Sequence, residues 1–509
     1  MYLSLLLKLV AIVPTAILLI YLCRELIVYQ NLNFYRRQGL KCFYIPVIGI
    51  ISKFIKQKGS NDQLGLLKKV LRENANEPMI LFNTSKVIKP AVFLINQDLI
   101  REFYVKELDC SFKAQINEHA QFGFFFQNGD HVAEARQTYA QFFNYDNLCA
   151  MNKEISSLLD RMMTAYKSTI DKDSWTRIDI KQYLDGIFSE IVNIILFGEK
   201  THKFIDGVDL TMAIKEYINS CFVVSACPLN NLSLGLLNNW SLLKQTRDFK
   251  KLFKKIENVC WDIYQDRKKS GPKDTPNLLD LLIILNAERV KSGKPELTKT
   301  EITGHFNLLQ FAGSDTSHEI LSSILYSLSK MTDVRSRFVD IVDSIISESQ
   351  VPISELSIKE YEKNSEYELY CEEFMRAINI LPVITARELT KDIKLGNYRL
   401  SKGSRINTAG GLLTQMPTIY PQGENFDAKQ YADIRSAPGK RPLNFTFGLG
   451  KRICIGKSLG DMTVKLVLAH FCHNFDISPD ASYVEHRKIK LTYGYVDPSI
   501  LIMPRCHAK

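Results

Sequence analysis

Apolar residues recur at helical spacing along most of the chain. In residues 154–166 and 249–265 they fall every three or four positions, which is the period of one helix face. Two polar stretches, 266–277 and 347–366, predict surface loops between helices. Strand-like stretches are short, at residues 87–95, 393–400 and 488–493. The pattern therefore predicts a mostly α fold (α+β) with small β-sheets.

One long helix is predicted to begin after Thr298, because Thr298 and Glu301 have the spacing of a capping box. A glycine inside a helix costs about 1 kcal/mol relative to alanine, so Gly313 invites a functional explanation. Taken alone, a helix with a tolerated glycine and a capped threonine is the plainer interpretation. Seven positions share one face of this helix: Ile302, Phe306, Leu309, Gly313, Thr316, Ile320 and Ile324.

The amino terminus carries the longest apolar run. Residues 2–23 are interrupted only by Lys8 and Pro14, and about 20 apolar residues cross a bilayer core as a helix. The run continues past Pro14, which argues against a cleaved signal peptide. We therefore expect a single-pass transmembrane anchor at residues 1–25, with a buried amino-terminal helix as the alternative. Basic residues follow the run and place the bulk of the protein on the cytoplasmic side: Arg24, Arg36, Arg37 and Lys41.

Behind the anchor, the chain is predicted to form one large domain. Residues 26–50 are expected to act as a hinge, stiffened by Pro46 and Gly49. Residues 51–509 contain no obvious linker, and an apolar share of 46% is ample for a large core. Eleven cysteines without C-x-x-C spacing predict free thiols rather than a disulfide framework. The sequence shows neither a basic helix nor a basic stripe interleaved with aromatic residues, so it does not suggest nucleic-acid binding.

The segment 447–456 carries the most specific chemistry in the chain. Its fixed positions are Phe447, Gly450, Arg452, Cys454 and Gly456. The two glycines allow a tight turn and a close approach to a flat macrocycle, because they lack a Cβ. The arginine can offer a bidentate fork to a carboxylate. The cysteine precedes a helix-like run, whose free N–H groups would stabilise a thiolate. A buried structural cysteine beside a glycine-rich turn is the plainer alternative.

These residues resemble the haem-ligand loop of the cytochrome P450 family. The resemblance implies a haem b cofactor with Cys454 as the axial thiolate ligand of the iron, and Arg452 as a ligand of a haem propionate. It also implies that Ala312 and Gly313 form the oxygen-binding part of the long helix. Asp315 and Thr316 would then organise the protons that the reaction consumes.

Further matches extend the resemblance over about residues 40–509. Glu373 and Arg376 lie three residues apart on one predicted helix face and can pair, as in the family's buried network. Arg387 matches the position of a propionate-binding arginine, and Arg136 matches another on a predicted helix. Phe447, Gly450 and Gly456 complete the cofactor-binding loop.

Two positions depart from the family pattern. Val132 stands four residues before Arg136, where the family often has tryptophan. Gln430 stands where an arginine usually completes the network with Glu373 and Arg376. We expect Gln430 to donate a hydrogen bond to Glu373 in place of that charge.

The resemblance implies a membrane-anchored haem-thiolate monooxygenase of the endoplasmic reticulum, with its catalytic domain in the cytosol. It would take electrons from an NADPH-dependent reductase or another donor, and act on an apolar small molecule. Two alternatives stay open: a haem-thiolate isomerase or dehydratase acting on peroxides, and a non-catalytic haem-binding membrane protein. Retention of the Asp315-Thr316 pair argues against the first, whereas Val132 and Gln430 motivate the second.

Surface charge and apolar runs suggest partners for such an enzyme. The chain has a formal charge of +10, most of which is explained by a solubilising surface. A basic patch near the cysteine loop would steer an acidic electron donor, and comprises Lys440, Arg441, Lys451, Arg452 and Lys457. Candidate pocket walls are Phe122, Phe124, Phe125, Phe126, Phe306, Leu309, residues 383–385 and residues 493–496; a phenylalanine-rich run is more often plain core.

Overall fold

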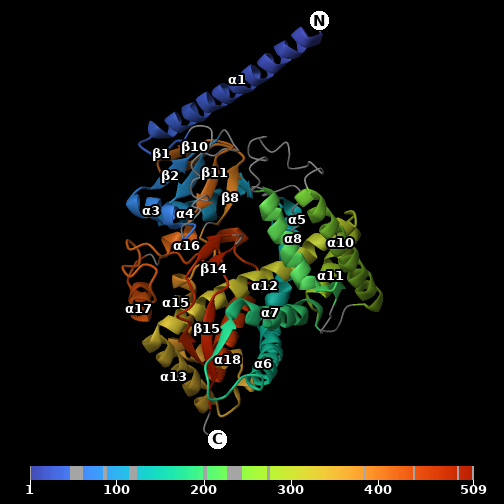
Figure 1. Ribbon diagram of the computed structural model, residues 1–509, viewed down its shortest axis with the longest axis vertical. Coiled ribbons are helices and arrows are strands. Elements are labelled where there is room, and N and C mark those ends of the chain that lie inside the picture. The colour runs from blue at the N-terminus through green and yellow to red at the C-terminus, as the bar shows by residue number, and fades with distance from the viewer. Residues whose placement is uncertain are drawn as a thin grey trace. The chain divides into compact units, whose positions relative to one another are not determined.

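The computed structural model describes residues 2–45, 61–83, 89–113, 123–125, 127–198, 203–225, 244–271, 276–382, 384–439, 442–489 and 492–506 (Figure 1). The chain divides into two compact units. The first comprises Met1–Ala114, Pro228–Leu237 and Val383–Leu413, and the second comprises Gln115–Cys227, Asn238–Pro382 and Thr414–Lys509. The fold is mostly helical with small sheets, which confirms the predicted fold class.

Helix α1 (Tyr2–Arg36) opens the first unit and is 35 residues long. It therefore extends through the first part of the segment that was expected to be a hinge, and residues 46–50 of that segment lie outside the described residues. Its carboxyl end is fixed by Tyr35, whose hydroxyl is 2.9 Å from Ser401 Oγ and 2.7 Å from Ser404 Oγ. Within the described part of the chain, no helix meets the length and apolarity needed to span a bilayer.

A six-stranded sheet forms the core of the first unit, in the order β1-β2-β3-β11-β8-β4. The pairs β1–β2 and β3–β11 are parallel, and the other pairs are antiparallel. The strands are β1 (Lys41–Phe43), β2 (Met79–Phe82), β3 (Ala91–Leu94), β4 (Ser111–Lys113), β8 (Ile384–Leu389) and β11 (Arg405–Thr408). Strand β3 lies within the stretch 87–95 predicted to be a strand, of which residues 87 and 88 are outside the described residues.

Short elements complete the first unit. The stretch 393–400 is a hairpin of β9 (Ile393–Leu395) and β10 (Tyr398–Leu400). The helical elements are α3 (Gly65–Glu73), α4 (Gln97–Glu102), η1 (Phe103–Glu107), η2 (Leu108–Cys110) and α16 (Gly410–Leu413).

The second unit is built around helix α12 (Lys299–Lys330), whose amino terminus has the predicted capping box between Thr298 and Glu301. The predicted helices 154–166 and 249–265 are confirmed, inside α6 and α10 respectively. The other long helices are α5 (Asp130–Ala140), α6 (Tyr145–Lys167), α7 (Ile180–Phe197), α8 (Leu210–Ser225), α10 (Lys244–Ser270), α11 (Leu278–Lys291), α13 (Thr332–Ser349), α15 (Ser365–Ala377), α17 (Ala428–Ser436) and α18 (Lys457–Asn474).

The polar stretches are more ordered than the sequence suggested. Helix α10 continues into the expected loop at 266–277, as far as Ser270. The expected loop at 347–366 contains η5 (Ile353–Glu355) and α14 (Ile358–Lys363), because Ser357 and Glu360 form a capping box. In the stretch 488–493, residues 488 and 489 belong to β13 (Arg487–Ile489) and Tyr493 to its antiparallel partner β14 (Tyr493–Tyr495), while residues 490 and 491 lie outside the described residues.

Small sheets and turns close the second unit. Strands β12 (Phe475–Pro479), β15 (Ser499–Pro504) and β5 (Thr176–Asp179) form a three-stranded sheet, and β6 (Phe204–Ile205) pairs with β7 (Val208–Asp209). Short 3₁₀ turns occur at η3 (Gln141–Phe143) and η6 (Gly450–Arg452).

Candidate functional site

The cysteine loop is a tight turn that leads into α18. Cys454 N donates to Phe447 O at 2.8 Å, and Ile453 N donates to Gly450 O at 3.0 Å. Gly448 and Gly450 have φ values of 78° and 66°, in the left-handed region that favours glycine. Cys454 itself is exposed, two residues before the helix cap at Gly456. The loop therefore presents a thiol next to the free N–H groups of a helix amino terminus.

The two predicted glycines of this loop do not have equal backbone roles. Gly450 is left-handed, as a tight turn requires, but Gly456 has φ −86°, which any residue adopts. Gly448 was missed by the sequence analysis, although its place two residues before Gly450 was the available signal. A Cβ at Gly456 would meet Phe143 at an ordinary 3.8 Å, so its close approach to a cofactor stays a prediction. Phe447 packs over the bare Cα of Gly460 on α18.

Two arginines connect the cysteine loop to other segments, Arg136 from outside the loop and Arg452 from within it. Arg136, on α5, donates from Nη2 to Ile453 O at 2.7 Å. Burial lowers the pKa of Arg136, and the Cys454 thiolate opposes that shift. Arg452 Nη2 lies 3.3 Å from the carbonyl oxygens of Phe124, Phe125 and Gln127. The structure thus brings Arg136, Arg452, Phe447 and Cys454 together, while Val132 is a buried core residue of α5.

Arg387 belongs to the first unit and lies on strand β8. Its Nε donates to Ser111 Oγ at 2.8 Å and its Nη2 to Ser111 O at 2.9 Å. Burial lowers the pKa of this guanidinium. Among the described residues, no carboxylate forms an ion pair with Arg387 or Arg136.

One face of α12 is left uncovered in the middle of a buried helix. Ala312 is exposed, and Gly313, Asp315 and Thr316 are half-buried, whereas most positions on either side are buried. The helix is uninterrupted from Lys299 to Lys330, so no break accompanies Gly313. Thr316 Oγ1 donates to Ala312 O at 2.7 Å, and Asp315 Oδ2 accepts from Thr492 Oγ1 at 3.4 Å. A bare backbone strip with an adjacent hydroxyl and carboxylate results.

The Glu373–Arg376 pair is buried, with each side chain 1% exposed. Arg376 donates to Glu373 through Nε and Nη2 at 2.5 and 2.7 Å. It also donates to the carbonyls of Thr414, Gly423 and Asn425 at 2.8, 2.8 and 2.9 Å. Burial raises the pKa of Glu373, and Arg376 acts in the opposite direction. The pair fixes the backbone of the segment that precedes the cysteine loop.

The prediction that Gln430 holds Glu373 is wrong. The remaining donor to Glu373 is the backbone N–H of Asp427, at 2.9 Å. Gln430 Oε1 instead accepts from Gln422 N at 3.3 Å, and its backbone N–H donates to the capping Asp427 Oδ1 at 2.8 Å. Since the amino-terminal cap of α17 supplies the donor, the network closes without a side chain from position 430.

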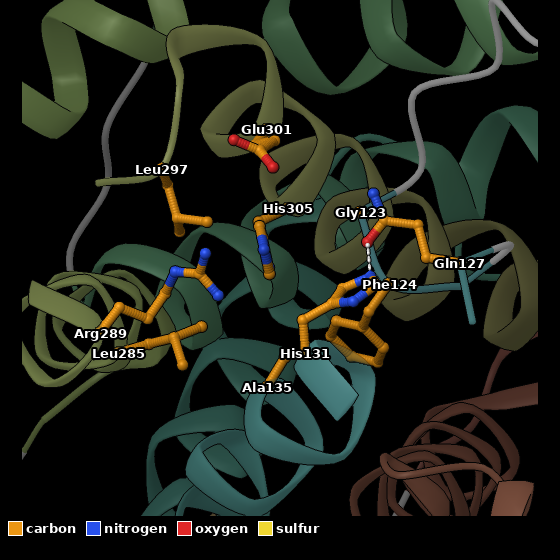
Figure 2. A pocket seen from close by; sticks show the side chains of 10 residues that line it. All are labelled: Gly123, Phe124, Gln127, His131, Ala135, Leu285, Arg289, Leu297, Glu301 and His305. Atoms are coloured by element: carbon orange, nitrogen blue, oxygen red, sulfur yellow. Dashed lines mark hydrogen bonds between the residues drawn. The ribbon is translucent and has the colours of Figure 1, made fainter. Parts of the chain in front are cut away.

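A small pocket lies between α5, α11 and the start of α12 (Figure 2). Figure 2 shows the His305 ring between Arg289 on one side and His131 with Phe124 on the other. His305 Nδ1 is 3.1 Å from the Tyr139 hydroxyl. The cavity volume of about 40 Å³ is far below the roughly 300–1,000 Å³ of organic-ligand pockets. It suits ordered water rather than a substrate.

The phenylalanines expected to line a substrate pocket have mixed positions. Phe124 is buried against Tyr139 with ring centroids 5.7 Å apart, and Phe306 packs against Phe197 at 6.1 Å. Both are core residues. Leu309 and Phe125 are half-buried. Phe122, Phe126 and residue 383 lie outside the described residues, as do Lys440 and Arg441 of the expected basic patch.

Acidification is expected to destabilise the protein partly through His305. Burial lowers the pKa of His305 from 6.5 to about 4. The unfolded chain therefore binds this proton first, so stability is lost as pH falls from 6.5 through 4. The loss reaches about 3 kcal/mol at full protonation. The free energy of unfolding in urea is measured at pH 7 and at pH 5. It should fall less between these two pH values in His305→Gln than in the wild type.

Burial also lowers the pKa of His470, to about 3, so some dependence remains in every variant. If the free energy of unfolding of His305→Gln depends on pH as strongly as that of the wild type, His305 does not contribute to the loss of stability at low pH.

The residues present fit a haem. Within the second unit, Cys454 carries an exposed thiol, and Arg136 is a guanidinium group without a carboxylate partner among the described residues. A desolvated cation needs a counter-charge, which the carboxylates of such a cofactor would supply. At the exposed Ala312, α12 carries only a methyl side chain, which would leave room for a flat ring, whereas Gly313 faces Val192.

Comparisons with known proteins agree with this fit. A family model described as Cytochrome P450 matches residues 45–498. Cytochrome P450 CYP72A613 of Trigonella foenum-graecum is 22% identical over 410 residues, which cover 78% of this chain and 75% of that protein. The 11-oxo-beta-amyrin 30-oxidase of Glycyrrhiza uralensis is 23% identical over 430 residues, covering 81% and 78%.

Two further similarities are limited in different ways, the first in the length that it covers and the second in sequence identity. Cytochrome P450 2A5 of Mus musculus is 24% identical over 307 residues, which cover 58% of this chain and 59% of that protein. The solved structure of retinoic acid bound cyanobacterial CYP120A1 is similar in fold, with a TM-score of 0.71 at 18% identity. That similarity covers 92% of this chain and 99% of the other.

Proposed function

The chain belongs to the cytochrome P450 family, because the family model matches residues 45–498, and from this premise we propose that it oxidises an apolar small molecule with electrons from a separate reductase. Members of the family are haem-thiolate monooxygenases, and this chain is one of them. Its cofactor is haem, bound to a cysteine thiolate.

One observation carries the assignment of the residues. The Cys454 thiol and Ala312 of α12 are both exposed, and both belong to the same unit. We assign Cys454 as the thiolate ligand, and Arg136, Arg452 and Arg387 as holders of the propionates. The haem, when bound, supplies the oxygen activation, which a thiolate ligand favours.

The protein's own contribution is to orient the substrate and to deliver protons. Thr316 Oγ1 donates to Ala312 O at 2.7 Å, and we assign this hydroxyl as the group that would supply a proton beside the cofactor. Asp315 follows as the acid that renews this proton from solvent. The peroxide isomerase alternative needs no such delivery, which favours the monooxygenase.

Reductase-dependent oxygen uptake by the full-length holoenzyme tests this reaction class. Candidate apolar compounds are supplied in a mixture, and products are identified by mass spectrometry with ¹⁸O₂. Incorporation of one ¹⁸O atom is the expected result. Conversion of a hydroperoxide without reductant would support the isomerase or dehydratase, and haem binding without either reaction would support the non-catalytic alternative.

Thr316→Ala is expected to uncouple the reaction rather than stop it. Removing the hydroxyl removes a positioned proton donor, so reductant consumption should continue while product per electron falls by about tenfold or more. Thr316→Ser keeps the hydroxyl and should retain most of the coupling. Peroxide release and product are measured together; equal coupling in all three proteins would remove Thr316 from the delivery of protons.

We also propose that α1 anchors the enzyme in the endoplasmic reticulum membrane, with the catalytic domain in the cytosol. Support comes from the apolar run at residues 2–23 and from exposed apolar side chains along the helix: Leu18, Leu19, Ile20, Leu22, Leu26 and Ile27. For the electron donor, the support is the exposure of Lys451 and Lys457 beside the cysteine loop. Arg452 is turned toward backbone carbonyls instead.

Deleting residues 2–23 should release the protein from membranes and leave haem binding intact. The deletion stops before Arg24 and keeps Val28, Leu32 and Tyr35, which are buried in the first unit. Membrane fractionation and haem content are the measurements. A full-length variant with Lys8→Leu, which lengthens the apolar run, should stay in the membrane. A deletion product that is insoluble and haem-free would make the segment part of the fold.

A further inference from the structure

Asp315 is one end of a charged strip that crosses three helices of the second unit. Lys215, on α8, lies with Nζ 4.0 Å from Asp315 Oδ1. The same Nζ is 3.0 Å from Asp185 Oδ1, on α7. The side chains are 16% exposed at Asp315, 23% at Lys215 and 31% at Asp185. The strip therefore leads from the half-buried face of α12 toward solvent.

The lysine is shared unequally between its two carboxylates. At 3.0 Å it forms a charge-assisted hydrogen bond with Asp185, while 4.0 Å from Asp315 is beyond hydrogen-bond distance. Asp315 also accepts a hydrogen bond from the Thr492 hydroxyl at 3.4 Å, which is weak as well. Lys215 and Thr492 thus make only weak contacts with the Asp315 carboxylate. Its rotation would therefore cost little interaction energy.

The groups around the strip do not neutralise it. His318, one turn after Asp315, directs Nε2 to Lys181 O at 2.9 Å and to Asp185 Oδ1 at 3.2 Å. Burial lowers the pKa of His318, with Lys215 acting in the same direction and Asp185 against it. Lys181 and Glu319 form their own pair at 2.7 Å. With His318 neutral, the two carboxylates of the strip share one ammonium, so the strip has a formal net charge of −1.

We propose that Lys215 is a positioning residue for proton delivery, and that Asp185 draws its ammonium away from Asp315 and so leaves that carboxylate free to take up and pass on a proton. The proposal rests on the proposed function, because it assumes that Asp315 delivers protons next to Thr316. A purely structural ion pair would be disturbed in the same direction by removing either partner. If Lys215 is a positioning residue, removing Asp185 and removing Lys215 should change the solvent isotope effect on oxygen reduction in opposite directions.

The test compares Asp185→Asn, Lys215→Met and the double variant as full-length holoenzymes. Single-turnover oxygen reduction after chemical reduction is followed in H₂O and D₂O, so that no organic substrate is needed. Asp185→Asn releases Lys215 to pair with Asp315, and should slow the reaction about tenfold, with a larger solvent isotope effect. This is less than the roughly 10²–10⁴-fold that a positioned proton-transfer group contributes, because Asp315 itself stays in place. Lys215→Met should lower the isotope effect.

The double variant is expected to behave like Lys215→Met, because Asp185 acts only through the lysine. Lys215→Arg keeps the charge and should stay close to the wild type. A matched control is Lys255→Met, which removes the lysine of the surface pair with Asp206 and should change nothing. Changes in the same direction for Asp185→Asn and Lys215→Met, or additive effects in the double variant, would overturn the proposal.

A crystal structure of Asp185→Asn gives a readout that is independent of turnover. Lys215 Nζ is expected within about 3 Å of an Asp315 oxygen; an unmoved lysine would reject the proposal. Asp315→Asn separates this inference from the function on which it rests. No change in oxygen reduction there rejects Asp315 as the acid, whereas a clear change there with no response to Asp185→Asn rejects Lys215 alone.

Discussion

Glu373→Ala should lower the free energy of unfolding by about 3–5 kcal/mol, the cost of leaving one partner of a buried ion pair uncompensated. Arg376 would remain in the core with its guanidinium bonded only to backbone carbonyls of Thr414, Gly423 and Asn425. The N–H of Asp427 would lose its acceptor as well. Because these groups fix the segment before the cysteine loop, haem content should fall with stability.

Urea unfolding and haem content per protein measure this effect, and α15 supplies its own control. Glu366 pairs with Arg337 on the surface, at 39% and 54% exposure, so Glu366→Ala should cost about 0–1 kcal/mol. Glu373→Gln keeps an acceptor for Asp427 and should fall between the two. Full haem occupancy in Glu373→Ala would mean that this network is not what holds the loop.

Gln430→Ala distinguishes the observed network from the one expected from sequence. The Gln430 side chain accepts one long hydrogen bond, from Gln422 N at 3.3 Å. Its removal should therefore lower the free energy of unfolding about as little as Glu366→Ala does. A loss comparable to that of Glu373→Ala would restore Gln430 to the network.

Cys454→Ser is expected to abolish the thiolate-specific, red-shifted Soret band of the ferrous carbonyl complex. A hydroxyl is a far weaker anionic ligand than a thiol, because the thiolate is the form that binds metals. The side chain is exposed in the loop, so the protein should still fold. The loss should be complete rather than graded.

Optical spectra of the purified full-length protein, with circular dichroism to check folding, decide the outcome. Cys506 is also exposed, and Cys506→Ser is the matched control that should keep the band. Cys371 is a poorer candidate ligand, since burial raises the pKa of its thiol well above 9.0. Persistence of the band in Cys454→Ser would require another ligand.

The sequence predicted what is encoded locally. The capping box at Thr298 and Glu301 and the turn around Gly450 depend on residues close in the chain, and both are present as predicted. The partner of Glu373 was missed because the donor is a backbone N–H, which every residue but proline carries. Lys215 was missed because α8 and α12 are separated by many residues, and nothing near Asp315 in the sequence indicates its ion pair.

Phe124 and Phe306 show the same limit from the apolar side. Helical spacing places Phe306 on the correct stripe of α12, but its neighbour across the core, Phe197, comes from α7. A periodic pattern indicates that a face is covered, and only the packing of distant helices decides whether protein or cofactor covers it.

The contact between β14 and α12 restricts the order in which this sequence can change. A Cβ at Gly494 would overlap the carboxylate of Glu319, which is paired with Lys181. A side chain at 494 therefore requires Glu319 to move or to become shorter, and either change disturbs its pair with Lys181. A library that randomises 494 alone should return mostly glycine among folded clones, whereas one that randomises 181, 319 and 494 jointly should also return larger residues at 494, together with changes at the other two positions.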